Sequence, residues 1–212
     1  MRQELAVYLV AGTQDVAKGD LVGFLEKALQ AGITCFQFRE KGVGSLTDRV
    51  QIIEMARKCQ LLCERYRVPF FVNDDIELAL ILGADGIHVG QDDRQIQEVI
   101  ALCGTKMKVG LSVSTVEEAV VASRMEGIDY LGAGPIFATR SKSDAKAPSG
   151  VVLLKQMRDL GITLPVVAIG GITIENVARV LQAGADGVAV ISALTRATEL
   201  EGDIKKFKGH CV

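Results

Sequence analysis

The chain has 212 residues, 49% of them hydrophobic, and its 24 Lys and Arg nearly balance its 26 Asp and Glu, for a formal net charge of −2. This length suits one sizeable core, so we expect a single domain over residues 1–212. The balanced charge argues against a nucleic-acid surface or an anionic-membrane surface as the main function.

The amino-terminal run and the cysteines bear on where the protein works. The apolar part of MRQELAVYLVAG (1–12) is too short for a signal peptide or a membrane span. The cysteines are odd in number, form no CxxC pair and mostly lie in apolar runs, which is typical of reduced thiols. They are Cys35, Cys59, Cys63, Cys103 and Cys211. We therefore expect a cytoplasmic protein, and the sequence leaves its oligomeric state open, a homo-oligomer included.

Short β-rich runs alternate with segments of helical periodicity along the whole chain. The expected strands are residues 5–10, 33–39, 69–73, 86–90, 108–113, 129–134, 165–170 and 186–191. Between most of them apolar residues recur every three or four positions, and helices are expected at 21–32, 46–66, 116–127 and 173–184; several of the segments before a strand end in Gly. A last helix is expected after Thr198. Eight such units predict a (β/α)8 TIM barrel, with a doubly wound open sheet as the alternative.

In a TIM barrel, functional residues gather at the carboxyl ends of the strands. The second strand ends in QFREK (37–41), where Gln37, Arg39 and Lys41 share one face. If the phenylalanines at positions 36 and 38 face the helices, these three residues point to the barrel mouth, where two cations and an amide could hold phosphate oxygens. Glu40 is expected to be a solvated strand end.

Acidic residues follow the third strand, in NDD (73–75), and the fourth, in HVGQDD (88–93). One Asp from each loop would suit magnesium, which prefers few protein carboxylates and fills its shell with water and substrate phosphate. An Asp after a strand is also a common helix cap, and this alternative applies to each of the four aspartates. His88 lies within a strand, where we expect a hydrogen-bonded core histidine rather than a general base.

The later strands also end in polar or small residues. Ser112 lies near the end of the fifth strand, and Ser114 or Thr115 is expected to cap the next helix. The seventh and eighth strands end in IGGI (169–172) and VISA (190–193), whose small residues would let backbone amides approach a phosphate. The glycines could instead simply form a tight turn.

The sixth strand leads into GPIFATRSKSDAKAPSG (134–150), a loop that holds Thr139, Arg140, Ser141 and Lys142 in succession. Hydroxyls and a lysine on a long loop at the barrel mouth suit a lid over a phosphorylated ligand. Alternatively, the basic residues only keep the loop soluble.

The motifs QFREK, VNDD, HVGQDD, GLS, GPIFATRSK, AIGGI and VIS, in this order over residues 37–192, resemble the thiamine-phosphate synthase family. The resemblance implies a transferase that joins 4-amino-2-methyl-5-(diphosphooxymethyl)pyrimidine to 4-methyl-5-(2-phosphooxyethyl)thiazole, with magnesium. The products would be thiamine phosphate and pyrophosphate, formed through a dissociative pyrimidine methyl cation.

The resemblance also implies roles for individual residues. The pyrimidine diphosphate would be held by Gln37, Phe38, Arg39, Glu40, Lys41, Asn73, Ser112 and Lys142. Among these, Arg39, Lys41 and Lys142 would be catalytic. The thiazole phosphate would be held by Thr139, Arg140, Ser141, Gly171, Ile191 and Ser192. Magnesium would lie between Asp74, Asp93 and the diphosphate, whereas Asp75 and Asp92 would have no metal role.

Three other functions remain open from the sequence. A related barrel could bind thiazole phosphate and isomerise it or act as a regulator. A phosphate-handling barrel of tryptophan or histidine biosynthesis would share the glycine-rich strand ends, but it would not predict QFREK and HVGQDD together. A non-enzymatic binding protein with this fold would be stabilised by ligand without turnover.

Overall fold

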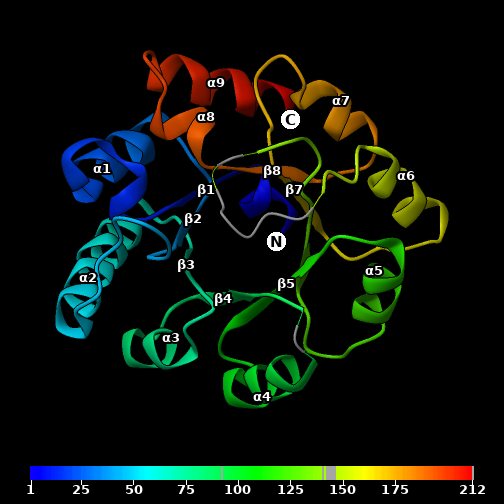
Figure 1. Cartoon of the computed structure of the whole chain (residues 1–212), viewed down its shortest axis with the longest axis horizontal. Helices are drawn as coiled ribbons and strands as arrows, with labels where there is room; N and C mark the ends of the chain where they lie inside the picture. Colours follow the sequence, from blue (N-terminus) through cyan, green and yellow to red (C-terminus); the bar gives the residue numbers. More distant parts are fainter. Residues whose placement is uncertain (92, 140, 142–146, 212) are drawn as a thin grey trace.

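The computed structural model describes residues 1–91, 93–139, 141 and 147–211, and for residues 93–95 its description is limited to the backbone. Eight parallel strands form a closed barrel with helices around it (Figure 1). The strands are β1 (Val7–Ala11), β2 (Cys35–Phe38), β3 (Phe70–Asn73), β4 (Gly86–Val89), β5 (Lys108–Val113), β6 (Tyr130–Ala133), β7 (Val166–Ile169) and β8 (Gly187–Val190). Because β1 pairs with both β2 and β8, the sheet has no free edge. The predicted TIM barrel is confirmed and the open sheet is excluded.

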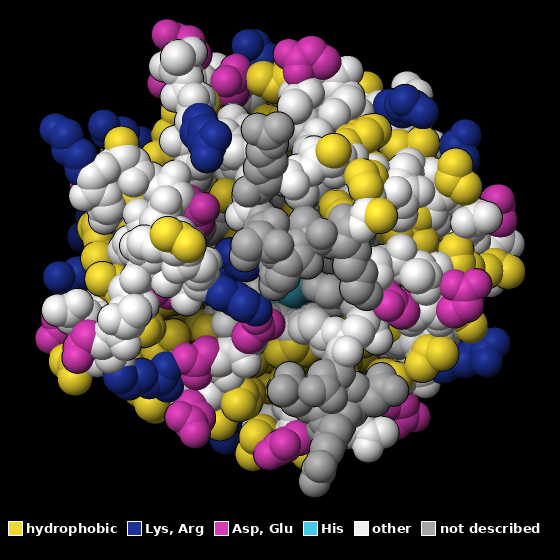
Figure 2. Space-filling view, viewed as in Figure 1, with side chains coloured by type: hydrophobic (Ala, Val, Ile, Leu, Met, Phe, Trp, Pro, Cys, Tyr) yellow, Lys and Arg dark blue, Asp and Glu magenta, His cyan; other side chains and the backbone are white. Residues whose placement is uncertain are grey.

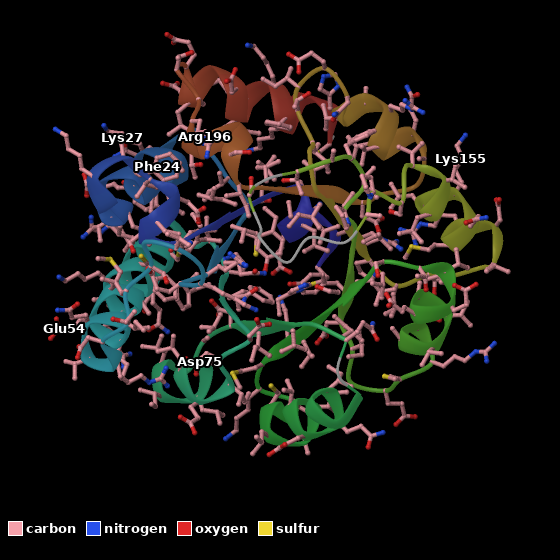
Figure 3. The ribbon with its side chains drawn as sticks, in the orientation of Figure 1. Phe24, Lys27, Glu54, Asp75, Lys155 and Arg196 are labelled. Carbon is pink, nitrogen blue, oxygen red and sulfur yellow. The ribbon has the colours of Figure 1, made fainter. Side chains whose placement is uncertain are left out.

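Helices surround the barrel in chain order (Figure 1). They are α1 (Leu21–Ala31), α2 (Arg49–Tyr66), α3 (Ile76–Leu82), α4 (Asp93–Cys103), α5 (Val116–Ser123), α6 (Val152–Asp159), α7 (Val177–Gln182), α8 (Ser192–Thr195) and α9 (Leu200–His210). The expected last helix is confirmed as α9. Three short 3-10 helices that the periodicity did not predict are η1 (Arg2–Leu5), η2 (Thr13–Asp15) and η3 (Ala17–Gly19). The labelled Lys27, Glu54 and Lys155 extend from the outer faces of their helices (Figure 3).

Helix α1 illustrates why these segments fold as they do. The carboxylate of Asp20 accepts a hydrogen bond from the backbone N–H of Gly23 at 3.0 Å and so caps the amino end. Leu21, Leu25, Ala28 and Leu29 recur on one face and are buried against the barrel. Gly32 then ends the helix with a left-handed φ of 98°, which costs glycine little, and the chain enters β2.

Apolar side chains form two layers, one between the strands and the helices and one inside the barrel. On β2 the two layers alternate: Phe36 and Phe38 pack in the outer layer and Cys35 packs inside. The inner layer consists of Leu5, Tyr8, Val10, Cys35, Phe71, Tyr130, Val167, Ala189 and Ile191. The predicted alternation on β2 is therefore confirmed, and η1 supplies Leu5 to this layer near the amino ends of the strands.

All five cysteines are free thiols, and four of them are buried. Among the described residues, no helix has the length and apolar character that crossing a membrane requires.

Candidate active site

Two adjoining cavities lie at the carboxyl ends of the strands. The larger, of about 580 Å³, is lined by residues that include Ser112, Thr139, Gly171 and Ser192. The smaller, of about 240 Å³, is lined by Arg39 and Lys41 among others. Both cavities are lined by Ser141, Ile191, Ser192 and Arg196. Figure 2 views this end of the barrel, where Lys and Arg side chains lie beside Asp and Glu near the centre of the face. The structure thus brings most of the predicted phosphate-binding residues into one continuous region.

The larger cavity holds the residues predicted for the thiazole phosphate. Ser141 Oγ donates a hydrogen bond to Ser192 Oγ at 3.0 Å, and the Ser141 backbone N–H donates to Thr139 Oγ1 at 3.2 Å. These contacts join the loop after β6 to the start of α8. Gly170 and Gly171 have left-handed φ values of 99° and 61°, and both line the cavity, so they form a tight turn and expose their backbone to the site. A cluster of hydroxyls and amides of this kind can hold phosphate oxygens without a full positive charge.

The smaller cavity holds the predicted cations of β2. Arg39 is 5% exposed, and its Nη1 donates a hydrogen bond to the carbonyl oxygen of Lys41 at 3.2 Å. The Lys41 ammonium forms an ion pair with the Asp74 carboxylate, with Nζ and Oδ2 2.9 Å apart. The two side chains are 50% and 45% exposed, so the pair faces the mouth of the barrel. A buried guanidinium beside an accessible ammonium is suited to an anion with several oxygens.

The two aspartates after β3 have different environments. Asp75 caps α3, because its Oδ1 accepts a hydrogen bond from the Leu78 N–H at 2.9 Å, and its carboxylate also pairs with Arg49. Asp74 has a left-handed φ of 60°, which is uncommon for a residue with a side chain, and its exposed carboxylate meets Lys41. The helix-cap alternative is therefore confirmed for Asp75, while Asp74 is accessible for another role.

The donor set is compatible with magnesium. Asp74 offers hard carboxylate oxygens, and Asn73, at the end of β3, offers a partly exposed amide next to it. Asp93 begins α4, but its side chain is outside the described part of the structure. The described residues contain no group of three or more His, Cys, Asp and Glu that could hold a metal alone. A cation held by few protein carboxylates would take the rest of its shell from water and substrate phosphate.

Two residues of the QFREK stretch do not direct their side chains to either cavity. Phe38 is 2% exposed and packs in the outer layer, facing the helices. Glu40 is not the solvated strand end that we expected: its carboxylate accepts hydrogen bonds from the backbone N–H groups of Thr13 and Leu46 and from the Thr13 hydroxyl. Glu40 thereby ties the loop after β1 to the loop after β2, which the strand pattern alone could not predict.

Polar residues also occupy the barrel interior beneath the cavities. Gln37 is 3% exposed and donates a hydrogen bond through Nε2 to the Tyr8 hydroxyl at 3.0 Å. Ser112 lines the larger cavity, and its Oγ lies 2.9 Å from Nε2 of His88. His88 is 8% exposed, with its Nδ1 2.9 Å from the Tyr130 hydroxyl, so the prediction of a hydrogen-bonded core histidine is confirmed. Thr115 is confirmed as the cap of α5.

Arg140, Lys142 and Asp92 lie outside the described residues, so the predictions for them remain predictions.

The sequence pattern missed one cation of the site. Arg196 follows α8 and lines both cavities, next to Ser192 (Figure 3). Its guanidinium makes no hydrogen bond or ion pair that involves the described part of the chain. The sequence does contain a signal for Arg196, because this basic residue follows the VIS motif by one helical turn. To place it at the barrel mouth, however, the short helix α8 would have had to be predicted.

Comparison with known proteins identifies the family. A profile described as thiamine monophosphate synthase matches residues 7–194. A thiamine-phosphate synthase of Listeria monocytogenes serotype 4a (strain HCC23) is 59% identical over 208 residues, which cover 98% of this chain and 97% of the relative. That of Pasteurella multocida (strain Pm70) is 45% identical, covering 97% and 96% of the two chains.

Solved structures agree with this assignment. A thiamine phosphate pyrophosphorylase from Pyrococcus furiosus superposes with a TM-score of 0.85 at 30% identity, covering 99% of this chain and 96% of that one. The tryptophan synthase α-subunit of the same organism, at 20% identity and a TM-score of 0.66, shares the fold alone. The motifs, the closed barrel and these full-length matches together show that the chain belongs to the thiamine monophosphate synthase family.

Proposed function

We propose that this chain joins the aminopyrimidine methyl diphosphate to the thiazole ethyl phosphate, forms thiamine phosphate and releases pyrophosphate at the two adjoining cavities. The observation that carries this proposal is the division of chemistry between them. Arg39 and Lys41 line only the smaller cavity, and Thr139 and Gly171 line only the larger one. The two cavities share Ser141, Ser192 and Arg196. A diphosphate and a monophosphate, held side by side, match this division in charge.

The pyrimidine diphosphate binds at the carboxyl ends of β2, β3 and β5 in this proposal. Arg39 and Lys41 bind its phosphate oxygens, and Lys142 belongs to the same predicted set. Gln37 and Asn73 recognise polar atoms of the pyrimidine side, and Ser112 donates a hydrogen bond to the diphosphate. Phe38 and Glu40 contribute through the backbone at most, because their side chains are engaged elsewhere.

The thiazole phosphate binds in the larger cavity. Thr139, Ser141 and Ser192 supply hydroxyl groups, and Gly171 and Ile191 supply the backbone. Arg140 belongs to the same predicted set. We add Arg196, whose guanidinium brings a charge that this group of hydroxyls lacks.

Asp74 and Asp93 would hold magnesium next to the diphosphate. When bound, the ion would supply charge neutralisation of the leaving pyrophosphate, in the way that few-carboxylate magnesium sites commonly serve phosphate chemistry. The ion pair between Lys41 and Asp74 would place the protein's ammonium group next to the same leaving group.

The reaction requires no general base at the site. The C–O bond to the diphosphate breaks first, so that pyrophosphate leaves with the electron pair and a pyrimidine methyl cation remains. The thiazole nitrogen, which has no proton to lose, then forms the C–N bond to this cation with its lone pair. Arg39 and Lys41 then stabilise the negative charge that develops on the departing oxygen, an electrostatic contribution that is commonly the largest in catalysis. His88, whose ring nitrogens lie within hydrogen-bond distance of Tyr130 and Ser112, is given no proton-transfer role in this proposal.

The test is a reaction of the purified chain with both substrates and magnesium, followed by mass detection of thiamine phosphate and measurement of pyrophosphate. We expect product only when both substrates and the metal are present, in equal amounts with pyrophosphate. Isomerised or merely bound thiazole phosphate without coupling would contradict the proposal and favour the isomerase, regulator or binding-protein alternatives.

A further inference from the structure

A continuous chain of hydrogen bonds crosses the barrel interior from β2 to β5. It runs from Gln37 Nε2 to the Tyr8 hydroxyl at 3.0 Å, and from there to the Tyr130 hydroxyl at 3.0 Å. It continues to His88 Nδ1 at 2.9 Å, and His88 Nε2 lies 2.9 Å from Ser112 Oγ. The two ends of this chain, Gln37 and Ser112, are the residues assigned above to the pyrimidine substrate.

The middle of the chain is sealed from solvent. Tyr8 is 1% exposed and Tyr130 is not exposed at all. Burial raises the pKa of both phenols well above the ordinary value, so each keeps its proton and donates one hydrogen bond. The packing is close: a Cβ added at Gly132 would lie 2.7 Å from Cε1 of His88, and one added at Gly110 would overlap the Tyr130 ring. The rings therefore have little freedom to change partners.

Such a chain can run in one of two directions. In the first, Gln37 donates to Tyr8, Tyr8 to Tyr130, and Tyr130 to Nδ1 of His88. His88 must then carry its proton on Nε2 and donate to Ser112, which leaves the Ser112 proton available to the cavity. In the second, every hydrogen bond is reversed, the Gln37 amide is flipped, His88 carries its proton on Nδ1, and Ser112 donates inward.

The Gln37 amide is placed with Nε2 toward Tyr8, which corresponds to the first direction; since the nitrogen and oxygen of an amide have nearly the same shape, the tautomer of His88 is the measurement that decides the direction. If the other hydrogen bonds were reversed while Gln37 kept this orientation, the Tyr8 hydroxyl could donate only to the sulfur of Cys35. This sulfur lies beside Tyr8 and is a weak acceptor. The first direction gives each hydroxyl and the ring N–H of the chain an oxygen or nitrogen acceptor, whereas a buried donor without an acceptor is destabilising.

We propose that Tyr8, Tyr130 and His88 are positioning residues that lock Gln37 and Ser112 into one hydrogen-bonding polarity. In this polarity Gln37 turns its carbonyl oxygen away from Tyr8, as an acceptor for the amino group of the pyrimidine. Ser112 at the same time presents a proton donor to the diphosphate. In the reversed polarity, Ser112 would offer the diphosphate only its lone pairs. The hydrogen-bonded chain therefore fixes the recognition of the pyrimidine ring and the recognition of the diphosphate at the same time. This inference rests on the proposed function for the identity of the groups that meet Gln37 and Ser112.

The tautomer of His88 reports the direction of the chain. The sequence contains two histidines, so a ¹⁵N spectrum of the enzyme labelled at histidine has two sets of ring signals, and His210→Gln assigns them. We expect neutral His88 with its proton on Nε2 in the wild-type enzyme. A proton on Nδ1, or on both nitrogens, at neutral pH would overturn the inference.

Tyrosine-to-phenylalanine variants then test the links singly. Tyr130→Phe removes the donor to Nδ1, so we expect a mixture of His88 tautomers and a fall of about tenfold in kcat/KM for the pyrimidine diphosphate, with the KM for the thiazole phosphate unchanged. Tyr8→Phe should lower the same kcat/KM yet keep the Nε2 proton, because Tyr130 can still donate to Nδ1. Tyr66→Phe is the matched control, since its hydroxyl meets only Gln30 at the surface.

The outcomes separate this inference from the proposed function. A wild-type enzyme that makes thiamine phosphate but holds His88 with an Nδ1 proton would refute the hydrogen-bonded chain alone. Equal losses for both substrates in Tyr130→Phe, with an unchanged His88 tautomer, would refute it as well and indicate general disorder of the core. A wild-type enzyme without coupling activity would refute the proposed function, whatever the tautomer.

Discussion

Asp74 and Asp75 are adjacent and chemically identical, and the structure gives them opposite tasks. Asp75 is tied to the start of α3 and to Arg49, whereas Asp74 is turned outward by its left-handed backbone to meet Lys41. Asp75 therefore stabilises the start of a helix, whereas Asp74 is the residue proposed to hold magnesium. Substitutions at the two positions should separate stability from metal dependence.

Asp74→Asn should raise the magnesium concentration needed for half-maximal activity by about tenfold, because a charged ligand is lost. Stability should not fall, since Asn tolerates the left-handed backbone.

Asp75→Ala should instead lower the free energy of unfolding by about 1 kcal/mol through the lost cap, with the magnesium requirement unchanged. Magnesium titrations and urea unfolding of both variants measure the two effects. A changed magnesium requirement in Asp75→Ala, together with a loss of stability in Asp74→Asn, would contradict the roles given to the two residues. Chelation of magnesium should abolish activity in the wild type.

Lys41 is expected to act in the transition state. Lys41→Ala should lower kcat on the order of 10²-fold, by analogy with the loss of one preorganised donor to a developing charge. Lys155→Ala, on the outer face of α6, is the matched control for loss of a lysine (Figure 3). Single-turnover measurements would show whether the chemical step changes, and an unaltered step would remove Lys41 from the catalytic set.

Arg196 is expected to act in binding rather than in the chemical step. Arg196→Ala should raise the KM for the thiazole phosphate by about tenfold, the loss of one charge-assisted contact of about 1.4 kcal/mol, and leave the KM for the pyrimidine diphosphate near its wild-type value. Arg196→Lys should recover part of the loss. Steady-state kinetics with each substrate varied in turn distinguishes this result from a general loss of activity.

At the scale of elements, the limits of the helices depend on their caps. The segment from Leu46 was expected to be helical, but α2 begins at Arg49, because the Asp48 side chain accepts a hydrogen bond from the Gln51 N–H and fixes the first turn there. The expected helix at 173–184 is also shorter in the structure, where α7 spans Val177–Gln182 and has no side-chain cap. Periodicity detects the buried face of a helix, whereas local side-chain hydrogen bonds determine where the helix starts.

Helix α5 gives a direct test of a cap. Thr115 Oγ1 accepts from the Glu118 N–H at 3.2 Å, and the Glu118 carboxylate accepts from the Thr115 N–H at 3.3 Å. Thr115→Ala should therefore cost about 1 kcal/mol of stability in urea unfolding, and Thr115→Ser should retain most of it. The kcat should not change, because Thr115 itself lines neither of the two cavities. Equal stabilities of the alanine and serine variants would mean that the hydroxyl does not cap α5.

At the scale of the whole molecule, an ion pair joins η1 to β5. Both carboxylate oxygens of Glu4 lie 2.8 Å from Lys108 Nζ, across 104 residues of sequence. Burial by itself would raise the pKa of Glu4, but its hydrogen bonds and charge interactions with Lys108 and the amino terminus outweigh burial and hold the pKa below its ordinary value. A lowered pKa in the folded state means that ionised Glu4 stabilises the fold above its unfolded pKa, and that this stabilisation is lost as the pH falls through the folded value.

Glu4→Gln should therefore lower the urea midpoint at pH 7, and the difference from wild type should shrink as the pH falls below about 4.5, the region of the unfolded pKa of Glu. Glu54→Gln, on the exposed face of α2, serves as the control and should have no such pH dependence (Figure 3). A difference that stays constant between pH 7 and pH 3 would show that the charge of Glu4 is not the source of the stabilisation.

The sequence by itself determined the eight strands, the barrel and the face on which the predicted phosphate-binding residues lie. It could do so because parallel strands alternate with helices in a regular rhythm, and because such a barrel directs all carboxyl ends to one face. Gln37 and Arg39 were assigned to the inner face of β2 from their alternation with two phenylalanines, and the structure agrees. The seven ordered motifs carried the family assignment that the comparisons confirm.

Only the tertiary structure decided which side chains meet. It joined Lys41 to Asp74, tied Glu40 to Thr13, brought Arg196 to both cavities and linked Gln37 to Ser112 through two tyrosines and a histidine. In the sequence Tyr8 and Tyr130 are only apolar members of two strands 122 residues apart. Their hydroxyl groups become a polar chain because closing the barrel turns β1 and β6 toward the same interior, where each buried donor must find an acceptor.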